Sequence, residues 1–85
     1  MALDKDETMA LDTDKIDDAV LALLALTLHG GYRAWKGFDW DALDRLHQKG
    51  LIGDPVGKTK SVVFTEEGRA KAIALREAMF GARKA

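Results

Sequence analysis

The sequence predicts one small α+β domain that is mostly helical and carries a pair of short strands. Three observations lead to this fold class. Apolar residues recur with helical spacing between residues 14 and 28. A second helical segment, Asp39 to Lys49, stops at Gly50 and is followed by two short apolar stretches separated by a polar turn. A third helix then begins at Thr65, so the order after residue 38 is helix, strand, turn, strand, helix.

Length and composition fit an ordinary globular domain. The 85 residues allow one domain with a small core, and 47% of them are hydrophobic and 32% charged. The absence of cysteine excludes a disulfide scaffold, a zinc ribbon and a thiol nucleophile. The longest apolar run, residues 19–28, is far shorter than the roughly 20 residues that span a bilayer. Acidic residues precede it where a signal peptide carries basic ones, so we expect a cytoplasmic protein.

Charge is distributed unevenly, although the formal net charge is only -1. Residues 1–18 hold seven acids and two bases, whereas residues 57–85 hold seven bases and three acids. A polyanion would therefore meet the second half of the chain. Along the chain we expect a disordered leader at 1–13, the domain at 14–81 and a frayed tail at 82–85.

The first helix is expected to begin near Asp14, with Thr13 or Asp14 as its cap, and to end at Gly30-Gly31. It carries two apolar stripes, one of Ile16, Val20, Leu23, Leu24 and Thr27 and the other of Leu21, Ala25 and Leu28. A helix that is apolar on most sides must be buried on most sides. We therefore expect a homodimer that covers the second stripe. The alternative is that the C-terminal helix covers it within one chain.

Residues 32–38 (YRAWKGF) are compatible with two structures, one short helical turn or an extended segment that pairs with the wing. Gly37 argues against a long helix. Large aromatic side chains in so small a chain are usually core, and we expect three of them there: Trp35, Phe38 and Trp40. The alternative is that Arg33 and Lys36, which flank Trp35, bind phosphate while the indole stacks on a base.

The helix that starts at Asp39 is capped by this residue and turns Leu43 and Leu46 to the core. Strands are expected at 51–52 and 60–64, joined by a polar turn at 53–58, and together they form a two-stranded wing.

The last helix is capped by Thr65, carries two acids in its first turn and ends at Gly81. Gly68 lies within the first turn, which indicates a close approach to the wing. The helix presents apolar residues on two neighbouring stripes: Ala72, Leu75 and Met79, and Ile73 and Phe80.

The run Leu43-x-x-Leu46-x-x-x-Gly50-Leu51-Ile52, a basic turn, and then VVFTEEGR at 62–69 resemble the wing end of winged-helix repressors. Similar sequences occur in the multiple-antibiotic-resistance and phenolic-acid-repressor types. The resemblance implies a small winged-helix-like domain, in which helix 39–49 enters the major groove and the turn at 53–60 touches the DNA backbone or minor groove. The chain departs from that pattern because the preceding helix is short or missing and three acids, Asp39, Asp41 and Asp44, begin the would-be recognition helix.

Three longer segments, 17–29, 33–55 and 57–68, are together similar to a small bacterial family of uncharacterised proteins. This likeness covers nearly everything after residue 13 and supports the fold without implying a function.

Six basic residues are the best candidates for a functional site. They are predicted to bind nucleic acid: Arg33, Lys36, Arg45, Lys49, Lys58 and Lys60. In a winged helix they would converge on one side, and each phosphate contact would add affinity and salt sensitivity. The alternative is a solvated rim that keeps the protein soluble.

Two functions are compatible with these patterns. The first is a nucleic-acid-binding regulator or accessory factor that forms a dimer, and it requires Lys58 and Lys60 on the same face as Lys49. The alternative is a protein–protein interaction module, a homodimer or adaptor without DNA binding, which requires an exposed apolar patch and dispersed bases. The expected partners are therefore DNA, a second copy or another protein, and not a membrane or a small-molecule cofactor.

Motifs for chemistry are weak. Gly57-Lys58-Thr59 ends like a phosphate-binding loop, but that loop needs a glycine where this chain has Ile52. The acids at 39, 41 and 44 are explained by helix capping rather than by calcium ligation. His29 and His47 are the only histidines, and Ser61 is the only serine. We therefore expect no catalytic residue, no metal site, no cofactor and no enzyme.

Overall fold

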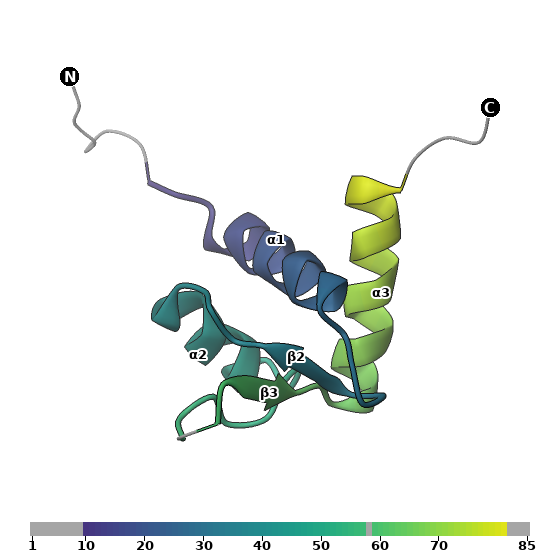
Figure 1. Cartoon of the computed structure of the whole chain (residues 1–85). Helices are drawn as coiled ribbons and strands as arrows, with labels where there is room; N and C mark the ends of the chain where they lie inside the picture. Colours follow the sequence, from purple (N-terminus) through teal and green to yellow (C-terminus); the bar gives the residue numbers. More distant parts are fainter. Residues whose placement is uncertain (1–9, 58, 82–85) are drawn as a thin grey trace.

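The computed structural model describes residues 10–57 and 59–81. They form three helices and a two-stranded antiparallel sheet (Figure 1). The order is α1 (Thr13–Leu26), β2 (Arg33–Trp35), α2 (Trp40–Gln48), β3 (Ser61–Val63) and α3 (Glu66–Phe80). This is the small, mostly helical α+β domain that the sequence predicts, and it is consistent with a winged-helix-like fold. Most of the predicted leader and the whole predicted tail lie outside the described residues.

Helix α1 is capped one residue earlier than predicted and ends several residues sooner. The Asp12 side chain accepts a hydrogen bond from the Lys15 backbone N–H at 3.2 Å, so Asp12 and not Thr13 or Asp14 is the cap. The helix stops at Leu26, before the predicted glycines. Gly30 and Gly31, with φ of 58° and 85°, instead form the turn that leads into β2.

The sheet pairs different segments from the predicted wing. β2 and β3 are antiparallel, with Trp35 opposite Ser61 and Arg33 opposite Val63. Of the two structures predicted for residues 32–38, a helical turn or an extended segment, the extended segment is therefore the correct one. The predicted strand at 51–52 is reduced to a single bridge between Ile52 and Phe64. The reason is local, because Gly53 and the following Pro55 cannot extend a paired strand far.

β3 nevertheless has neighbours on both sides. The Phe64 N–H donates to the Tyr32 carbonyl on the β2 side, at 2.6 Å. The Val63 carbonyl accepts from the Gly53 N–H on the other side, at 2.7 Å. The chain therefore leaves the sheet after Gly53 and returns to it at Lys60.

The predictions for the two later helices are confirmed. The Asp39 side chain caps α2 by accepting from the Ala42 N–H at 3.1 Å, and the helix ends just before Gly50. The Thr65 hydroxyl caps α3 by accepting from the Gly68 N–H at 2.9 Å. A Cβ at Gly68 would lie 1.6 Å from the Leu51 carbonyl oxygen, so the close approach predicted for this glycine is present.

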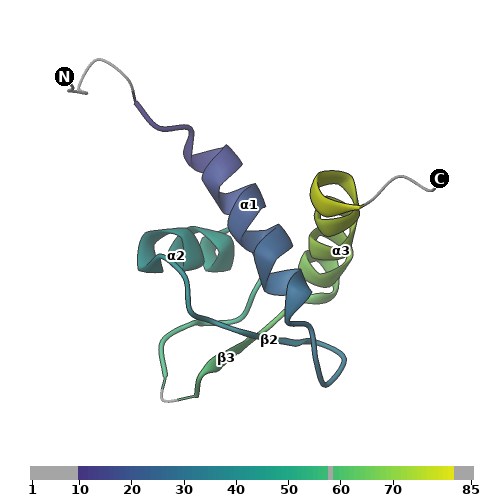
Figure 2. The same cartoon turned by 45° about the horizontal axis from the view of Figure 1, so that its top comes forward.

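Helix α1 lies at the centre of the packing and contacts α2, β2 and α3 (Figures 1 and 2). Its buried residues join those of the other elements in one core: Val20, Leu21, Leu24, Ala25, Ala34, Ala42, Leu43, Leu46, Leu51, Ile52, Val62, Phe64 and Ala72. Helix α3 packs against α1, and Leu21 and Ala25 of the second apolar stripe are buried within the chain. Leu26, at the end of α1, remains 58% exposed.

The two tryptophans do not belong to this core, which corrects the prediction. Trp35 is 53% exposed and Trp40 is 56% exposed, whereas Phe38 packs partly against the core. On β2 the alternation of side chains turns Ala34 inward and therefore Trp35 outward. On α2 the inward positions belong to other residues, and Trp40 lies in the first turn on a different side.

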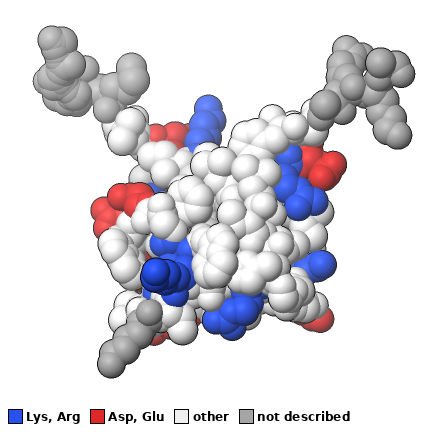
Figure 3. All heavy atoms as spheres, in the orientation of Figure 1, with Lys and Arg blue, Asp and Glu red and all other residues white. Residues whose placement is uncertain are grey.

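One face of the molecule has an uncharged area over α1, with charged side chains toward the rim (Figure 3). Among residues 10–57 and 59–81, no helix combines the length and the apolar character needed to cross a membrane.

Candidate functional site

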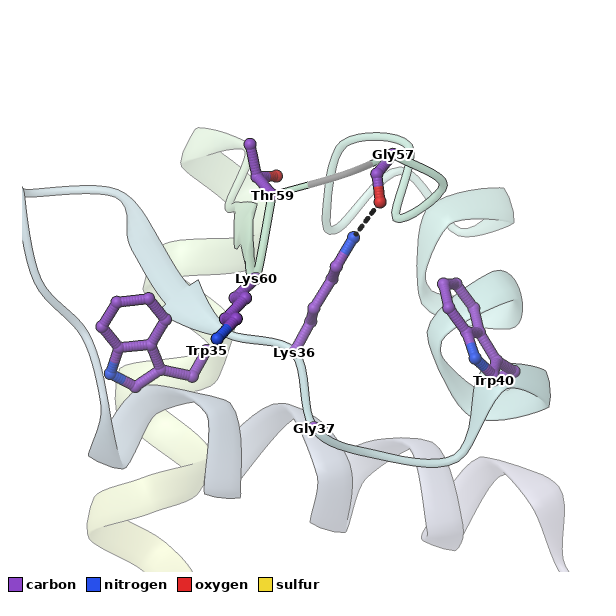
Figure 4. A pocket seen from close by; sticks show the side chains of 7 residues that line it. All are labelled: Trp35, Lys36, Gly37, Trp40, Gly57, Thr59 and Lys60. Carbon is purple, nitrogen blue, oxygen red and sulfur yellow. Dashed lines mark hydrogen bonds between the residues drawn. The ribbon is translucent and has the colours of Figure 1, made fainter.

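A cavity of about 500 Å³ opens between the end of β2, the start of α2 and the loop before β3 (Figure 4). Seven described residues line it: Trp35, Lys36, Gly37, Trp40, Gly57, Thr59 and Lys60. Of these seven, two are tryptophans, two are lysines and none carries a carboxylate. We call this cavity the tryptophan pocket. Its size falls in the range of about 300–1,000 Å³ that is usual for small-ligand sites.

Trp35 is held in place by the turn that follows α1. Its backbone N–H donates to the Thr27 hydroxyl at 3.0 Å. Its indole stacks on the His29 ring, with centroids 4.4 Å apart and planes inclined by 28°. The His29 Nδ1–H in turn donates to the Thr27 carbonyl at 2.7 Å. One face of the indole is therefore occupied, and the exposed part of the ring belongs to the pocket.

Lys36 crosses the pocket between the two indoles (Figure 4). Its Nζ donates to the carbonyl oxygens of Pro55 and Gly57, at 2.7 and 3.1 Å. The same ammonium lies 5.8 Å from the centroid of the Trp40 ring. Lys36 thus joins the loop at 55–57 to the pocket wall, and its charge is already shared with three partners.

Of the six predicted basic residues, the structure brings Lys36 and Lys60 together at the pocket. Lys60 is exposed. Arg33 lies two residues before Trp35 on β2, hence on the same face of the strand, and its Nε donates to the Ser61 hydroxyl at 3.1 Å. Lys58 lies outside the described residues.

Arg45 and Lys49 line no part of the pocket and instead bind Asp17 of α1. The Arg45 Nε donates to both carboxylate oxygens at 2.9 Å, and the Lys49 Nζ donates to one of them at 2.9 Å. The Lys49 ammonium also lies 3.1 Å from an oxygen of Asp14. The Asp17 side chain is completely buried. We call Asp17, Arg45 and Lys49 the α1–α2 ion cluster.

The ion cluster shifts the pKa of its members. Burial alone would raise the pKa of Asp17, but the hydrogen bonds and positive charges of Arg45 and Lys49 hold it below the ordinary value of 3.8. The same contact with Asp17 raises the pKa of Lys49. Sequence reasoning missed this cluster. The sequence held one signal for it. Asp17 lies four residues before Leu21 and therefore on the second apolar stripe of the helix, where a carboxylate turned to the core needs charged partners.

Asp39 and the two histidines have structural roles. Asp39 caps α2, and Asp41 and Asp44 are exposed. The His47 Nδ1–H donates to the Ile52 carbonyl at 3.2 Å. Within the described part of the chain, no group of three or more histidine or acidic residues is arranged to hold a metal ion.

Comparison with known proteins identifies the family. A family model described as "Domain of unknown function (DUF6429)" matches residues 12–82. The chain belongs to this family. An "Uncharacterized protein y4hR" of Sinorhizobium fredii (strain NBRC 101917 / NGR234) is 60% identical to the DUF6429 chain over 72 residues, which are 85% of this chain and 97% of the relative. No solved structure matches it. The likeness to an uncharacterised family is confirmed, and the likeness to winged-helix repressors stays a prediction.

The tryptophan pocket gives this DUF6429 domain two kinds of binding group. Exposed indole surfaces stack on planar rings or cover apolar groups. The Lys60 ammonium can form a charge-assisted hydrogen bond to an anion such as phosphate. Because these groups lie side by side, the site suits a ligand that is planar in one part and anionic in another.

Proposed function

We propose that this DUF6429 domain is a nucleic-acid-binding accessory factor or regulator, and not an enzyme. The observation that carries the proposal is the composition of the tryptophan pocket. Two tryptophans more than half exposed stand beside two lysines, without a carboxylate among the described lining residues. Nucleic acids combine planar rings with phosphates, and both kinds of group find a partner here.

In this proposal only part of the predicted basic set contacts nucleic acid, and Lys49 no longer has to share a face with Lys58 and Lys60, because it belongs to the α1–α2 ion cluster. Arg45 and Lys49 are paired with the two carboxylates of Asp17 and Asp14, so they add little attraction for phosphate. Lys60 and Arg33 lie beside the pocket and supply the phosphate contacts, together with Lys58 as the sequence predicts. The exposed Asp41 and Asp44 keep the start of α2 away from phosphates, so specificity for base sequence is weak.

Fluorescence anisotropy with a labelled mixed-sequence nucleic acid, at low salt and then across a salt series, tests the proposal. We expect micromolar binding that weakens as salt rises, because counterions are released. Lys60→Glu should weaken it. Lys15→Glu, an equal charge change in the first turn of α1, is the matched control and should weaken it much less. Absence of binding at low salt to both duplex and single strands would refute the proposal.

A second candidate function, a protein-interaction module that forms a homodimer, is favoured by a different observation. Met79 and Phe80, in the last turn of α3, are 44% and 48% exposed. Because about half of each side chain is already covered, burial of the rest against a second copy would stabilise a dimer by about 0.7–1.5 kcal/mol for each side chain. Sedimentation velocity tests it: a dimer that Phe80→Glu converts to monomer would support this function, and a monomer at high concentration would reject it.

A further inference from the structure

We propose that the tryptophan pocket binds unpaired bases of single-stranded nucleic acid, with Trp35 and Trp40 as stacking surfaces and Lys60 at a phosphate. This inference rests on the proposed function and narrows it. It names the form of nucleic acid, the two side chains that contact bases, and the loop that places the cation. Three properties of the pocket support it: its exposed indole surfaces, the contacts that these indoles make within the chain, and its charge.

Stacking requires access to the faces of the bases. In a duplex these faces are covered by neighbouring base pairs, and only the base edges are open in the grooves. An indole can stack only on a base that has left the duplex or never entered one. The pocket offers two indoles on separate elements, β2 and α2, on either side of the Lys36 side chain (Figure 4). A duplex would leave both of these surfaces unused.

Each of the two indoles is contacted by a side chain of the same chain. Trp35 is fixed by the backbone bond to the Thr27 hydroxyl and by stacking on His29. Trp40 belongs to the first turn of α2, which Asp39 caps, and the Lys36 ammonium lies over its ring. Exposed aromatic side chains that are already ordered lose little conformational entropy when a ligand arrives. The arrangement is therefore that of a prepared binding surface.

The charge of the pocket is placed by the loop before β3. Lys36 donates to the carbonyls of residues 55 and 57, so it is a positioning residue for the loop rather than a free contact for phosphate. Lys60 lies at the end of that loop, directly before β3. Its backbone carbonyl accepts from the Lys36 N–H at 2.9 Å, which fixes the Lys60 backbone next to the pocket. A strand whose bases stack on the indoles would carry its phosphates past this cation.

Single-stranded DNA and RNA share this chemistry and differ in the 2′-hydroxyl of the sugar. The test therefore has three arms, short oligodeoxyuridylate, oligouridylate and a duplex of mixed sequence. Anisotropy of a labelled strand gives the affinity in each arm. Intrinsic fluorescence adds a local readout, because the chain has two tryptophans and both line the pocket. We expect both single strands to bind more tightly than the duplex and to change the tryptophan emission.

Substitutions of the aromatic side chains make the test specific. Trp35→Ala and Trp40→Ala should each weaken single-strand binding by about 5- to 140-fold, the loss of one base–aromatic stack. Trp35→Phe and Trp40→Phe keep a stacking ring and should retain most of the affinity. Tyr32→Ala is the matched control, because Tyr32 is 40% exposed but stands over Arg69 outside the pocket, and it should change little. Circular dichroism spectra confirm that each variant is folded.

The outcomes separate this inference from the proposed function. Equal or tighter binding of the duplex, with unchanged tryptophan emission, would overturn the inference and leave the proposed function standing. Single-strand binding that the folded alanine variants do not weaken would also overturn it. No binding in any arm would overturn both. Tighter binding of oligouridylate than of oligodeoxyuridylate would support the inference and add a contact to the 2′-hydroxyl.

Discussion

Asp17 shows how one residue determines the contact between two helices. Its carboxylate is completely buried, and a buried charge without partners would be very unfavourable. Arg45 and Lys49 remain about one third exposed, so water reaches them while they bind the carboxylate. The ion cluster therefore fixes α2 against α1, and its two cations are already paired with a carboxylate.

Replacement of Asp17 by asparagine should lower the free energy of unfolding by about 2 kcal/mol, because hydrogen bonds to a buried charged group are lost. Urea denaturation at neutral pH measures the change. Asp18→Asn is the control, since Asp18 is partly exposed and lies 3.7 Å from Lys71, a surface pair worth less than about 1 kcal/mol. Equal losses in the two variants would contradict the role given to the ion cluster.

Acidification should remove the stabilisation that the Asp17 carboxylate provides. The pKa of Asp17 is lower in the folded state than its ordinary value of 3.8, so the unfolded chain takes up the proton first. The stabilisation is complete at pH well above that value and disappears as the pH falls through the lower pKa of the folded state. The difference in unfolding free energy between the native chain and Asp17→Asn should therefore be constant from pH 7 to about pH 5 and then shrink. A difference in unfolding free energy that stays constant down to pH 2 would contradict this role of the Asp17 carboxylate.

At the scale of elements, the helices were predictable because their signals are local. The caps at Asp39 and Thr65, the glycine stop at Gly50 and the apolar spacing all lie within a few residues of the helix that they define. The early end of α1 was not predictable from the glycines, because these residues serve the turn that follows and not the helix.

Pairing between strands was harder to predict because it joins distant residues. The partner of β3 is β2, about 28 positions earlier, and not the neighbouring residues 51–52. The same pairing decides which way Trp35 points, and therefore whether its indole lies in the core or in the tryptophan pocket. Lys36 and Lys60 were predicted as site residues, but the roles of Trp40 and Asp17 needed the packing of α2 and so were missed.

The close contact between Gly68 of α3 and the Leu51 carbonyl gives a prediction at the scale of elements. Glycine to alanine inside a helix normally stabilises it by about 1 kcal/mol. At Gly68 the added Cβ would collide with the Leu51 carbonyl, which also accepts the Thr65 N–H at 3.1 Å. Gly68→Ala should therefore lower the unfolding free energy by about 2–3 kcal/mol. Thermal denaturation measures the change. Gly37→Ala is the control and should be nearly neutral, because no atom lies within 4 Å of its new Cβ.

At the scale of the whole molecule, charge limits the strength of any nucleic-acid complex. The formal net charge is -1, and one face is uncharged over α1 (Figure 3). Each phosphate contact with a single strand contributes a slope of about -0.7 to the logarithm of the binding constant against the logarithm of the salt concentration. With two or three contacts near the pocket, we expect a slope of about -1.5 to -2 in an anisotropy series. A slope several times steeper would require cations beyond those assigned to the site.

The hydrogen bonds at the margins of the sheet have a consequence for how copies of this domain can associate. Along β2, the outer backbone groups are occupied by His29, which exchanges two hydrogen bonds with Arg33, and by the Thr27 hydroxyl. On the other margin the Ile52 carbonyl accepts from His47. A strand of another molecule would have to displace these partners before it could extend the sheet. Extension of this sheet by a strand of another copy is therefore disfavoured, whereas association through the helix surfaces meets no such obstacle.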